Sequence, residues 1–352
     1  MTSFWRDDYE LDGCKLQYHP EWVAAWRAGT VSNPPIYVEA SPSGRCNQRC
    51  VFCSVQHLRN SPKGAGVRLR QLLANLGDAG VKACMLGGEG EPLLAGDEVC
   101  APRGLVLALT TNGTMMDREW MDAHASKFTW IKVSVNAGTM STYGKVHRCS
   151  PTMWMDVWDN ISYLCSKSPR PTVGVQMVVI PENRDEAFHL TKRAAKSGCD
   201  YVVFKPCVVV PEQGEGAHGL KRADAFTPTE QNILYSVGRP DFRVIIRKAA
   251  FNGVHGAETQ GRPCHSIPFV YAYIASSGDV YACGAHLGDE RFVIGNVNTD
   301  DFASIWNSPR RLAAIEFMKT FDTSACRRQC RMAQCNHYLN RIRNPHPHDA
   351  FI

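Results

Sequence analysis

Three cysteines stand within the short sequence SPSGRCNQRCVFCSVQ, which spans residues 41–56. Cys46, Cys50 and Cys53 have the spacing C-x3-C-x2-C. Structural zinc takes four ligands, whereas three thiolates can bind three of the four iron corners of a cubane iron–sulfur cluster. The fourth iron is then open to a reacting partner. The spacing therefore indicates a cluster that binds a cofactor, with a zinc site lacking one ligand and chance spacing as alternatives.

A second group of cysteines lies near the C-terminus. The chain has 15 cysteines, and because disulfides are rare in a reducing compartment, clustered thiols indicate metal binding or catalysis. Cys264 and Cys283 flank a predicted β-hairpin, and Cys326, Cys330 and Cys335 follow a predicted helix. Four thiolates brought together here would close a cubane cluster, although they would also suit tetrahedral zinc.

The elements that must position these cysteines alternate along the chain. Apolar runs predict buried parallel strands, and the amphipathic stretches between them predict helices. The predicted strands are 36–41, 83–88, 105–113, 130–138, 172–180 and 201–206, and the predicted helices are 66–79, 117–127, 153–167, 184–197 and 309–320. This alternation favours an α/β fold: a partial (β/α)6 TIM-like barrel, followed by a small α+β domain built on the hairpin. The polar strand ends then lie on the active face of the barrel.

Bulk composition narrows the class of protein. A hydrophobic content of 44% with 21% charged residues is ordinary for a soluble globular chain. The net charge of +5 is too weak to indicate nucleic-acid binding, and it fits an anionic small ligand equally well. The sequence has no apolar run of membrane-spanning length and no signal-peptide start. We therefore expect a cytoplasmic protein with neither nucleic-acid nor membrane partners.

The first cysteine group, with Phe52 before its last member and a strand ahead of it, resembles the radical S-adenosylmethionine (SAM) superfamily. The sequence GGEGEP at 87–92 is similar to the glycine-rich motif of that superfamily, which implies that Gly88 and Glu89 contact the methionine amino group of SAM. The resemblance implies that SAM chelates the fourth iron of a [4Fe–4S] cluster. Reduction by an external flavodoxin- or ferredoxin-type donor then yields a 5′-deoxyadenosyl radical that abstracts hydrogen from substrate.

Three polar residues at predicted strand ends extend this resemblance. Ser134 and Asn136 lie where relatives contact the ribose or carboxylate of SAM, and Gln176 would reach the cofactor or the substrate. For each of these residues the alternative is a polar group that neighbouring backbone satisfies.

The second cysteine group resembles the twitch, or shortened SPASM, domain that follows some radical SAM barrels. The sequences IGNV and IW before the last cysteines are also similar to that family. The resemblance implies one auxiliary [4Fe–4S] cluster, held by Cys264, Cys283, Cys326 and Cys330. The final pair is C-x3-C where the family has C-x2-C, so the fourth ligand is Cys326 or Cys335.

These features divide the chain into five segments. They are an N-terminal extension (1–35), the barrel (36–225), a connector (226–263), the auxiliary-cluster domain (264–345) and a tail (346–352).

The resemblance is strongest to enzymes that modify sugars, aminocyclitols or nucleosides in antibiotic biosynthesis. We expect dehydrogenation of an alcohol to a ketone, with the auxiliary cluster accepting one electron from the substrate radical. Epimerisation is the first alternative, with Cys207 or Cys335 as hydrogen-atom donor. Decarboxylation of a sugar acid is the second alternative.

Three further residues could take part in catalysis or binding, and two other classes of protein were considered. Lys205 would bind a carboxylate or phosphate of SAM or substrate, or act as a base. Glu182 and Glu212 would accept a hydroxyl proton, although both are more often ordinary surface charges. A peptide-modifying maturase remains open, but residues 1–35 are too short for the separate leader-binding domain of many such proteins. A non-enzymatic scaffold that binds zinc or an iron–sulfur cluster is disfavoured, because the three cysteines of the first group leave one iron of the cluster without a protein ligand.

Overall fold

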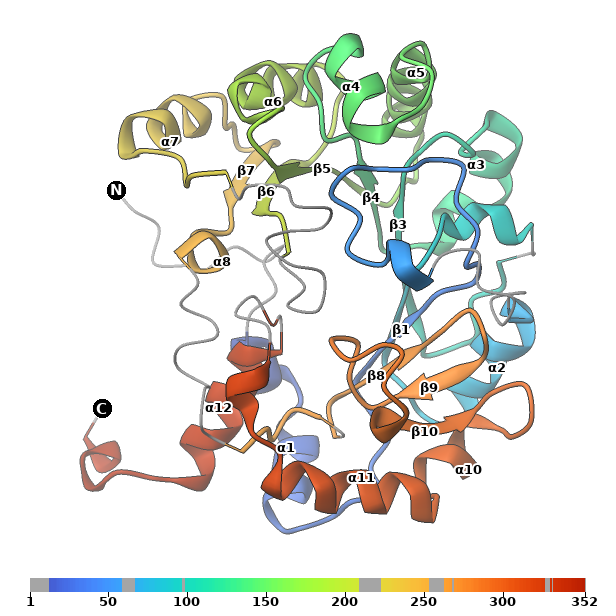
Figure 1. Ribbon diagram of the computed structural model, residues 1–352, viewed down its shortest axis with the longest axis vertical. Helices are drawn as coiled ribbons and strands as arrows, with labels where there is room; N and C mark the ends of the chain where they lie inside the picture. Colours follow the sequence, from blue (N-terminus) through green and yellow to red (C-terminus); the bar gives the residue numbers. More distant parts are fainter. Residues whose placement is uncertain are drawn as a thin grey trace.

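The computed structural model describes residues 13–58, 67–96, 99–208, 223–252, 263–267, 269–326, 330 and 332–351. The strands of this part are β1 (Tyr37–Ala40), β2 (Ala83–Leu86), β3 (Val106–Thr111), β4 (Trp130–Ser134), β5 (Thr172–Val179), β6 (Tyr201–Pro206), β7 (Arg243–Ile246), β8 (Tyr271–Ile274), β9 (Asp279–Tyr281) and β10 (Val293–Asn296). Among the described residues they form one sheet in the order β10-β9-β8-β1-β2-β3-β4-β5-β6-β7 (Figure 1). Each pairing from β1 to β7 is parallel, which confirms the predicted α/β fold with a partial barrel.

Helices connect the parallel strands. The α-helices of the described part are α1 (Pro20–Arg27), α2 (Leu69–Asp78), α3 (Arg118–His124), α4 (Met140–His147), α5 (Met153–Ser166), α6 (Ala187–Lys196), α7 (Pro228–Tyr235), α8 (Lys248–Asn252), α10 (Phe302–Trp306), α11 (Pro309–Thr320) and α12 (Ala333–Arg343). Figure 1 shows α4, α5, α6 and α7 outside the strands β4 to β7. The five predicted helices correspond to α2, α3, α5, α6 and α11. No helix in the described ranges is long and apolar enough to cross a membrane.

Local sequence explains where these elements lie. In β5 all residues but the first are buried, as expected of a parallel strand covered on both faces. Asp117 caps α3 and Ser308 caps α11 with their side-chain oxygens, while Thr227 and Glu230 form a reciprocal capping box at the start of α7. These three helices therefore begin at residues suited to satisfy their free amides.

The C-terminal hairpin belongs to the same sheet as the barrel. Strand β8 pairs in parallel with β1, which places Tyr273 opposite Glu39 and Tyr271 opposite Tyr37. Strands β9 and β10 continue the sheet with antiparallel pairing. The predicted hairpin is therefore confirmed, but it extends the barrel sheet and does not start a separate one.

The elements that were not predicted include β7 and α4. Part of the expected connector forms β7, which pairs in parallel with β6 and adds a seventh strand to the barrel. This four-residue run is too short to stand out from its surroundings. Helix α4 was missed because its sequence, MSTYGKVH, contains Gly144 and several polar residues.

The N-terminal extension packs against the end of the chain. A short 3-10 helix, Gly13–Tyr18, contacts α12, and Trp26 shares a buried cluster with Leu339. The indole of Trp306 donates a hydrogen bond to the carbonyl of Asn33 at 2.6 Å. These contacts tie the first and last parts of the chain together below β8 and β9 in Figure 1.

Candidate active site between two groups of cysteines

The first cysteine loop follows the carboxyl end of β1, where the active face of a barrel lies. Cys46, Cys50 and Cys53 are all half-buried on this loop. The amide of Val51 donates to the carbonyl of Val146, in α4, at 2.9 Å. Helix α4 therefore holds the loop in place.

His147, the last residue of α4, contacts a thiol of this loop. Its Nδ1 lies 3.0 Å from Sγ of Cys50, and its Nε2 lies 2.9 Å from the carbonyl oxygen of Val135. Since a carbonyl only accepts, Nε2 carries the proton and Nδ1 accepts from the Cys50 thiol. Burial lowers the pKa of His147 to about 4, so the ring is neutral at pH 7. His147 was not predicted as a site residue, because a histidine within a polar helix carries no distinguishing pattern.

The glycine-rich sequence after β2 packs against the start of the same loop. A Cβ on Gly90 would lie 2.2 Å from the carbonyl oxygen of Arg45, so only glycine fits there. The amide of Glu91 donates to that same carbonyl at 2.8 Å. A Cβ on Gly88, where φ is 130°, would lie 2.2 Å from the hydroxyl of Tyr273. The motif and the cysteine loop therefore form one closely packed unit.

The two carboxylates of this motif have different partners. Glu89 accepts hydrogen bonds from the amide and the hydroxyl of Ser276, and burial raises the pKa of Glu89. Glu91 accepts from the hydroxyl of Thr111 at 2.6 Å and from the amide of Asn112 at 2.7 Å. Burial raises the pKa of Glu91 to about 7. The contact between Glu89 and the amino group of SAM stays a prediction.

Ser134 and Asn136 lie at the end of β4, and Ser134 pairs with Gln176 within β5. The side-chain nitrogen of Gln176 donates to Oγ of Ser134 at 3.2 Å, and its buried oxygen Oε1 has no hydrogen-bond partner among the described residues. Asn136, with a φ of 55°, accepts from the amide of Val178 at 2.7 Å and donates to the carbonyl of Ser134. The side chain of Asn136 is therefore hydrogen-bonded to backbone, whereas Oε1 of Gln176 could still accept a hydrogen bond. Their cofactor roles stay predictions.

The second group of cysteines converges from separate segments. Burial raises the pKa of the Cys264 thiol to about 12, and the nearby thiols of Cys330 and Cys326 contribute, so these three residues are neighbours. Cys283 follows β9 and is buried, and Cys335 lies half-buried on α12. Cys264, Cys326 and Cys330 therefore lie near one another, and the ligand set of the auxiliary cluster stays a prediction.

A cavity of about 590 Å³ connects the two groups. Ser54 and Val55, which directly follow the first group, line one part of it, and Cys283 and Cys330 line another. Its volume lies within the range of about 300–1,000 Å³ that is typical of small-ligand pockets. Gln176 also lines the cavity.

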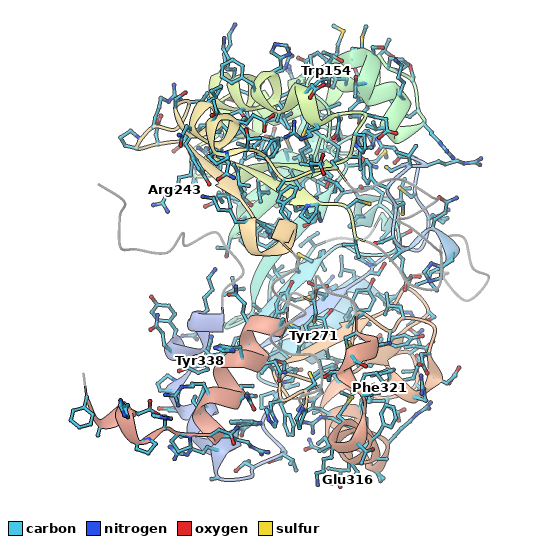
Figure 2. The ribbon with its side chains drawn as sticks, turned by 60° about the vertical axis from the view of Figure 1, so that its left-hand side comes forward. Trp154, Arg243, Tyr271, Glu316, Phe321 and Tyr338 are labelled. Atoms are coloured by element: carbon cyan, nitrogen blue, oxygen red, sulfur yellow. The ribbon has the colours of Figure 1, made fainter. Side chains whose placement is uncertain are left out.

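The cavity wall carries polar residues that the sequence analysis did not single out. Lys132 and Arg247 line it together with the predicted Lys205, and Glu39 faces them from β1. The hydroxyl of Tyr271 donates to Glu39 at 3.1 Å. Figure 2 shows Tyr271 on the sheet between the barrel helices and the C-terminal helices. A lysine at an inward position of an otherwise apolar strand is the signal that could have revealed Lys132.

The remaining predicted residues are not among the described residues that line the cavity. Cys207 is buried in the main hydrophobic core and is not among the described residues that line the cavity. Glu182 is exposed, and Glu212 lies outside the described residues. Phe52 packs edge-on against His147, with ring centroids 5.8 Å apart. The roles of these four residues stay predictions.

The donor chemistry of both groups fits iron–sulfur clusters, although within the described ranges no three His, Cys, Asp or Glu side chains stand close enough together to hold a metal ion. Thiolates are the ligands of such clusters. Three thiols share one loop beside the cavity, and Cys283 and Cys330 of the second group line the same cavity. A partial barrel with an open set of three thiols at its active face is the architecture of an enzyme that binds a cofactor at a cluster.

Comparison with known proteins identifies the two parts of the chain. Residues 40–194 match the model of the radical SAM superfamily, and residues 264–336 match that of SPASM, an iron–sulfur cluster-binding domain. No curated protein matches the chain. The chain contains a radical SAM domain followed by a SPASM domain, and its cofactors are SAM and [4Fe–4S] clusters.

Solved structures share this fold. Streptococcus suis SuiB bound to precursor peptide SuiA is 16% identical, with a TM-score of 0.61, and the match covers 98% of this chain and 82% of that one. The structure of anSMEcpe with bound AdoMet is 16% identical, with a TM-score of 0.51, and the match covers 82% of this chain and 85% of that one. At this identity the likeness shows the fold alone.

Proposed function

We propose that this chain is a radical SAM enzyme that oxidises a substrate held in the cavity between its two cysteine groups. The observation that carries the proposal is the cavity itself, because Ser54 and Val55 reach it from the first group while Cys283 and Cys330 reach it from the second. A substrate bound there would face both clusters.

The thiolates of Cys46, Cys50 and Cys53 hold the cluster that binds SAM. Cys264, Cys283 and Cys330, with Cys326 or Cys335, hold the auxiliary cluster. When bound and reduced by an external one-electron donor, these groups supply a 5′-deoxyadenosyl radical and an acceptor for one electron. The protein's own part is to position the substrate and to exclude water.

The proposed reaction is dehydrogenation of an alcohol. The carbinol carbon gives its hydrogen atom to the deoxyadenosyl group, which leaves as 5′-deoxyadenosine. The substrate then loses its hydroxyl proton and one electron and becomes a ketone. The auxiliary cluster, when bound, would accept the electron, and Glu39, the only carboxylate on the described part of the cavity wall, would accept the proton.

The first candidate substrate is a hydroxylated small molecule of the sugar, aminocyclitol or nucleoside type. The volume of the cavity, about 590 Å³, supports this class. Epimerisation with a thiol donor and decarboxylation of a sugar acid are alternative outcomes for the same substrate radical.

A peptide is the second candidate substrate. The observation that favours it is the shared fold with SuiB, whose structure contains precursor peptide SuiA, and with anSMEcpe, whose structure contains a peptide. One side chain of a peptide would then enter the cavity.

The test is anaerobic incubation of the reconstituted protein with SAM, a reductant and a panel of sugars, nucleosides and peptides. Mass spectrometry distinguishes the outcomes: a loss of about 2 mass units for oxidation, none for inversion and about 44 for decarboxylation. We expect 5′-deoxyadenosine from the wild-type protein and none from Cys50→Ala. Equal amounts from both proteins would refute the proposed function.

A further inference from the structure

Thiols of the second cysteine group accept hydrogen bonds from neighbouring backbone amides. The amide of Ala285 lies 3.4 Å from Sγ of Cys283 and donates to it. The amides of Ser266 and Ile267 donate to Sγ of Cys264. Hydrogen bonds to the sulfur atoms are among the features that set the reduction potential of an iron–sulfur cluster. The backbone around the second group therefore stabilises negative charge on these sulfur atoms.

His286 places a ring nitrogen beside a third thiol of this group. It lies three residues after Cys283, and its Nε2 is 3.9 Å from Sγ of Cys326, within reach of a hydrogen bond to the large sulfur atom. Two aromatic rings hold the imidazole. Phe292 stacks on it with ring centroids 4.3 Å apart, and Phe321 packs edge-on against it with centroids 5.5 Å apart. The orientation of the imidazole is therefore fixed from two sides.

The chemistry of a bound thiolate decides which nitrogen of His286 carries the proton. As a thiol, Cys326 can donate to Nε2, since a neutral imidazole has one accepting nitrogen. A thiolate that binds iron has no proton and can only accept a hydrogen bond. The contact is then favourable when the imidazole carries its proton on Nε2. One of the two neutral tautomers meets this requirement, so the ring need not change its charge.

We propose that His286 donates a hydrogen bond from Nε2 to the thiolate of Cys326 and thereby raises the reduction potential of the auxiliary cluster. The inference rests on the proposed function, in which this cluster accepts one electron from the substrate radical. It also assigns the fourth ligand to Cys326 and not to Cys335. Because reduction adds negative charge to the cluster, a donor at one of its sulfur atoms stabilises the reduced form more than the oxidised form.

The test is a potentiometric titration of anaerobically reconstituted protein, followed by electron paramagnetic resonance. Cys50→Ala serves as the background, because the auxiliary cluster alone then gives a signal. In this background His286→Phe keeps an aromatic ring beside Phe292 and Phe321 but removes the donor. We expect the equilibrium constant for reduction of the auxiliary cluster to fall about tenfold, which is ~59 mV at one electron. His286→Gln, whose amide offers an N–H group at a similar reach, should restore most of the potential.

His265→Phe is the matched control. His265 also lies beside a cysteine of the second group, but its ring packs edge-on against Trp26, with centroids 5.9 Å apart. Its replacement should leave the potential unchanged. A potential in His286→Phe equal to that of the control, or one in His286→Gln as low as in His286→Phe, would overturn the proposal. Loss of the auxiliary cluster from His286→Phe would also overturn it, because the residue would then hold the cluster and not tune it.

Iron content tests the assignment of the fourth ligand. In the otherwise wild-type chain, Cys335→Ala should keep about eight irons and Cys326→Ala about four. The opposite result would refute the role of Cys326. The potential is measured without SAM or substrate. Failure of the proposed function therefore appears separately, as an absence of 5′-deoxyadenosine from the wild-type protein.

Discussion

The carboxylate of Glu89, after the end of β2, accepts hydrogen bonds from both the amide and the hydroxyl of Ser276, in the turn between β8 and β9. Both residues are buried. The contact joins the glycine-rich motif of the radical SAM domain to the hairpin of the SPASM domain. It therefore links the two segments that position the two groups of cysteines.

Removing the Ser276 hydroxyl should weaken this link. Because a buried carboxylate loses one of its donors, we expect Ser276→Ala to lower the free energy of unfolding by about 1–3 kcal/mol. Urea denaturation measures the change. Ser277→Ala, in the same turn, removes a bond to Asp279 that is only partly buried and should cost less than about 1 kcal/mol. Equal losses in the two variants would contradict the role of the contact.

Replacing Gly90 should disturb the first cysteine loop. The added Cβ of Gly90→Ala would clash with the backbone of Ser43 and Arg45, so the loop ahead of Cys46 must move. We expect the iron content after anaerobic reconstitution to fall from about eight to about four per chain, with the auxiliary cluster retained. Gly87→Ala is the matched control, since its Cβ would meet nothing closer than 3.5 Å and the variant should keep about eight irons. Normal iron content in Gly90→Ala would refute the expected clash.

The stability of the protein should depend on pH through Lys205. Burial lowers the pKa of Lys205 to about 8, below its ordinary value of 10.5. Between these two pH values the unfolded chain holds the proton and the folded chain does not, so folding becomes more favourable as pH rises. Lys205→Met should remove this rise and stabilise the protein at pH 7 by about 3 kcal/mol. Thermal midpoints of both proteins from pH 7 to about pH 10 test this, and parallel profiles would show that the charge is not buried.

Cys207→Ala distinguishes the two leading reactions. If the thiol gives a hydrogen atom to the substrate radical, the variant should release ketone or stall in place of the inverted product. If the reaction is dehydrogenation, turnover should stay within about threefold of the wild type, because Cys207 packs in the core and lies off the described cavity wall. Product analysis with the substrate found in the panel gives the answer. Complete loss of 5′-deoxyadenosine would fit neither reaction.

Much of the barrel could be predicted from the sequence. Strands such as TVGVQMVV are mostly apolar over eight residues, and this pattern has few alternatives in an α/β protein. The cysteine spacing marked both cluster loops because thiol chemistry requires those residues. In contrast, β7 has four residues and α4 contains Gly144, so neither had enough length or periodicity to be recognised.

Side-chain partners were harder to predict than elements. The contact between His147 and Cys50 joins residues that are 97 positions apart. The pairing of β8 with β1 joins strands that are still farther apart along the chain. Such contacts depend on how strands are ordered in the sheet, which the sequence of one strand does not encode. The cationic wall formed by Lys132, Lys205 and Arg247 became visible only when three strands were placed side by side.

The binding of SAM to an open iron of the first cluster is the central claim, and electron paramagnetic resonance tests it most directly. Anaerobically reconstituted protein is reduced with dithionite, and its spectrum is recorded with and without SAM. We predict that SAM changes the signal of the first cluster and that Cys50→Ala lacks both this signal and its change. A wild-type spectrum that SAM leaves unaltered would contradict the account.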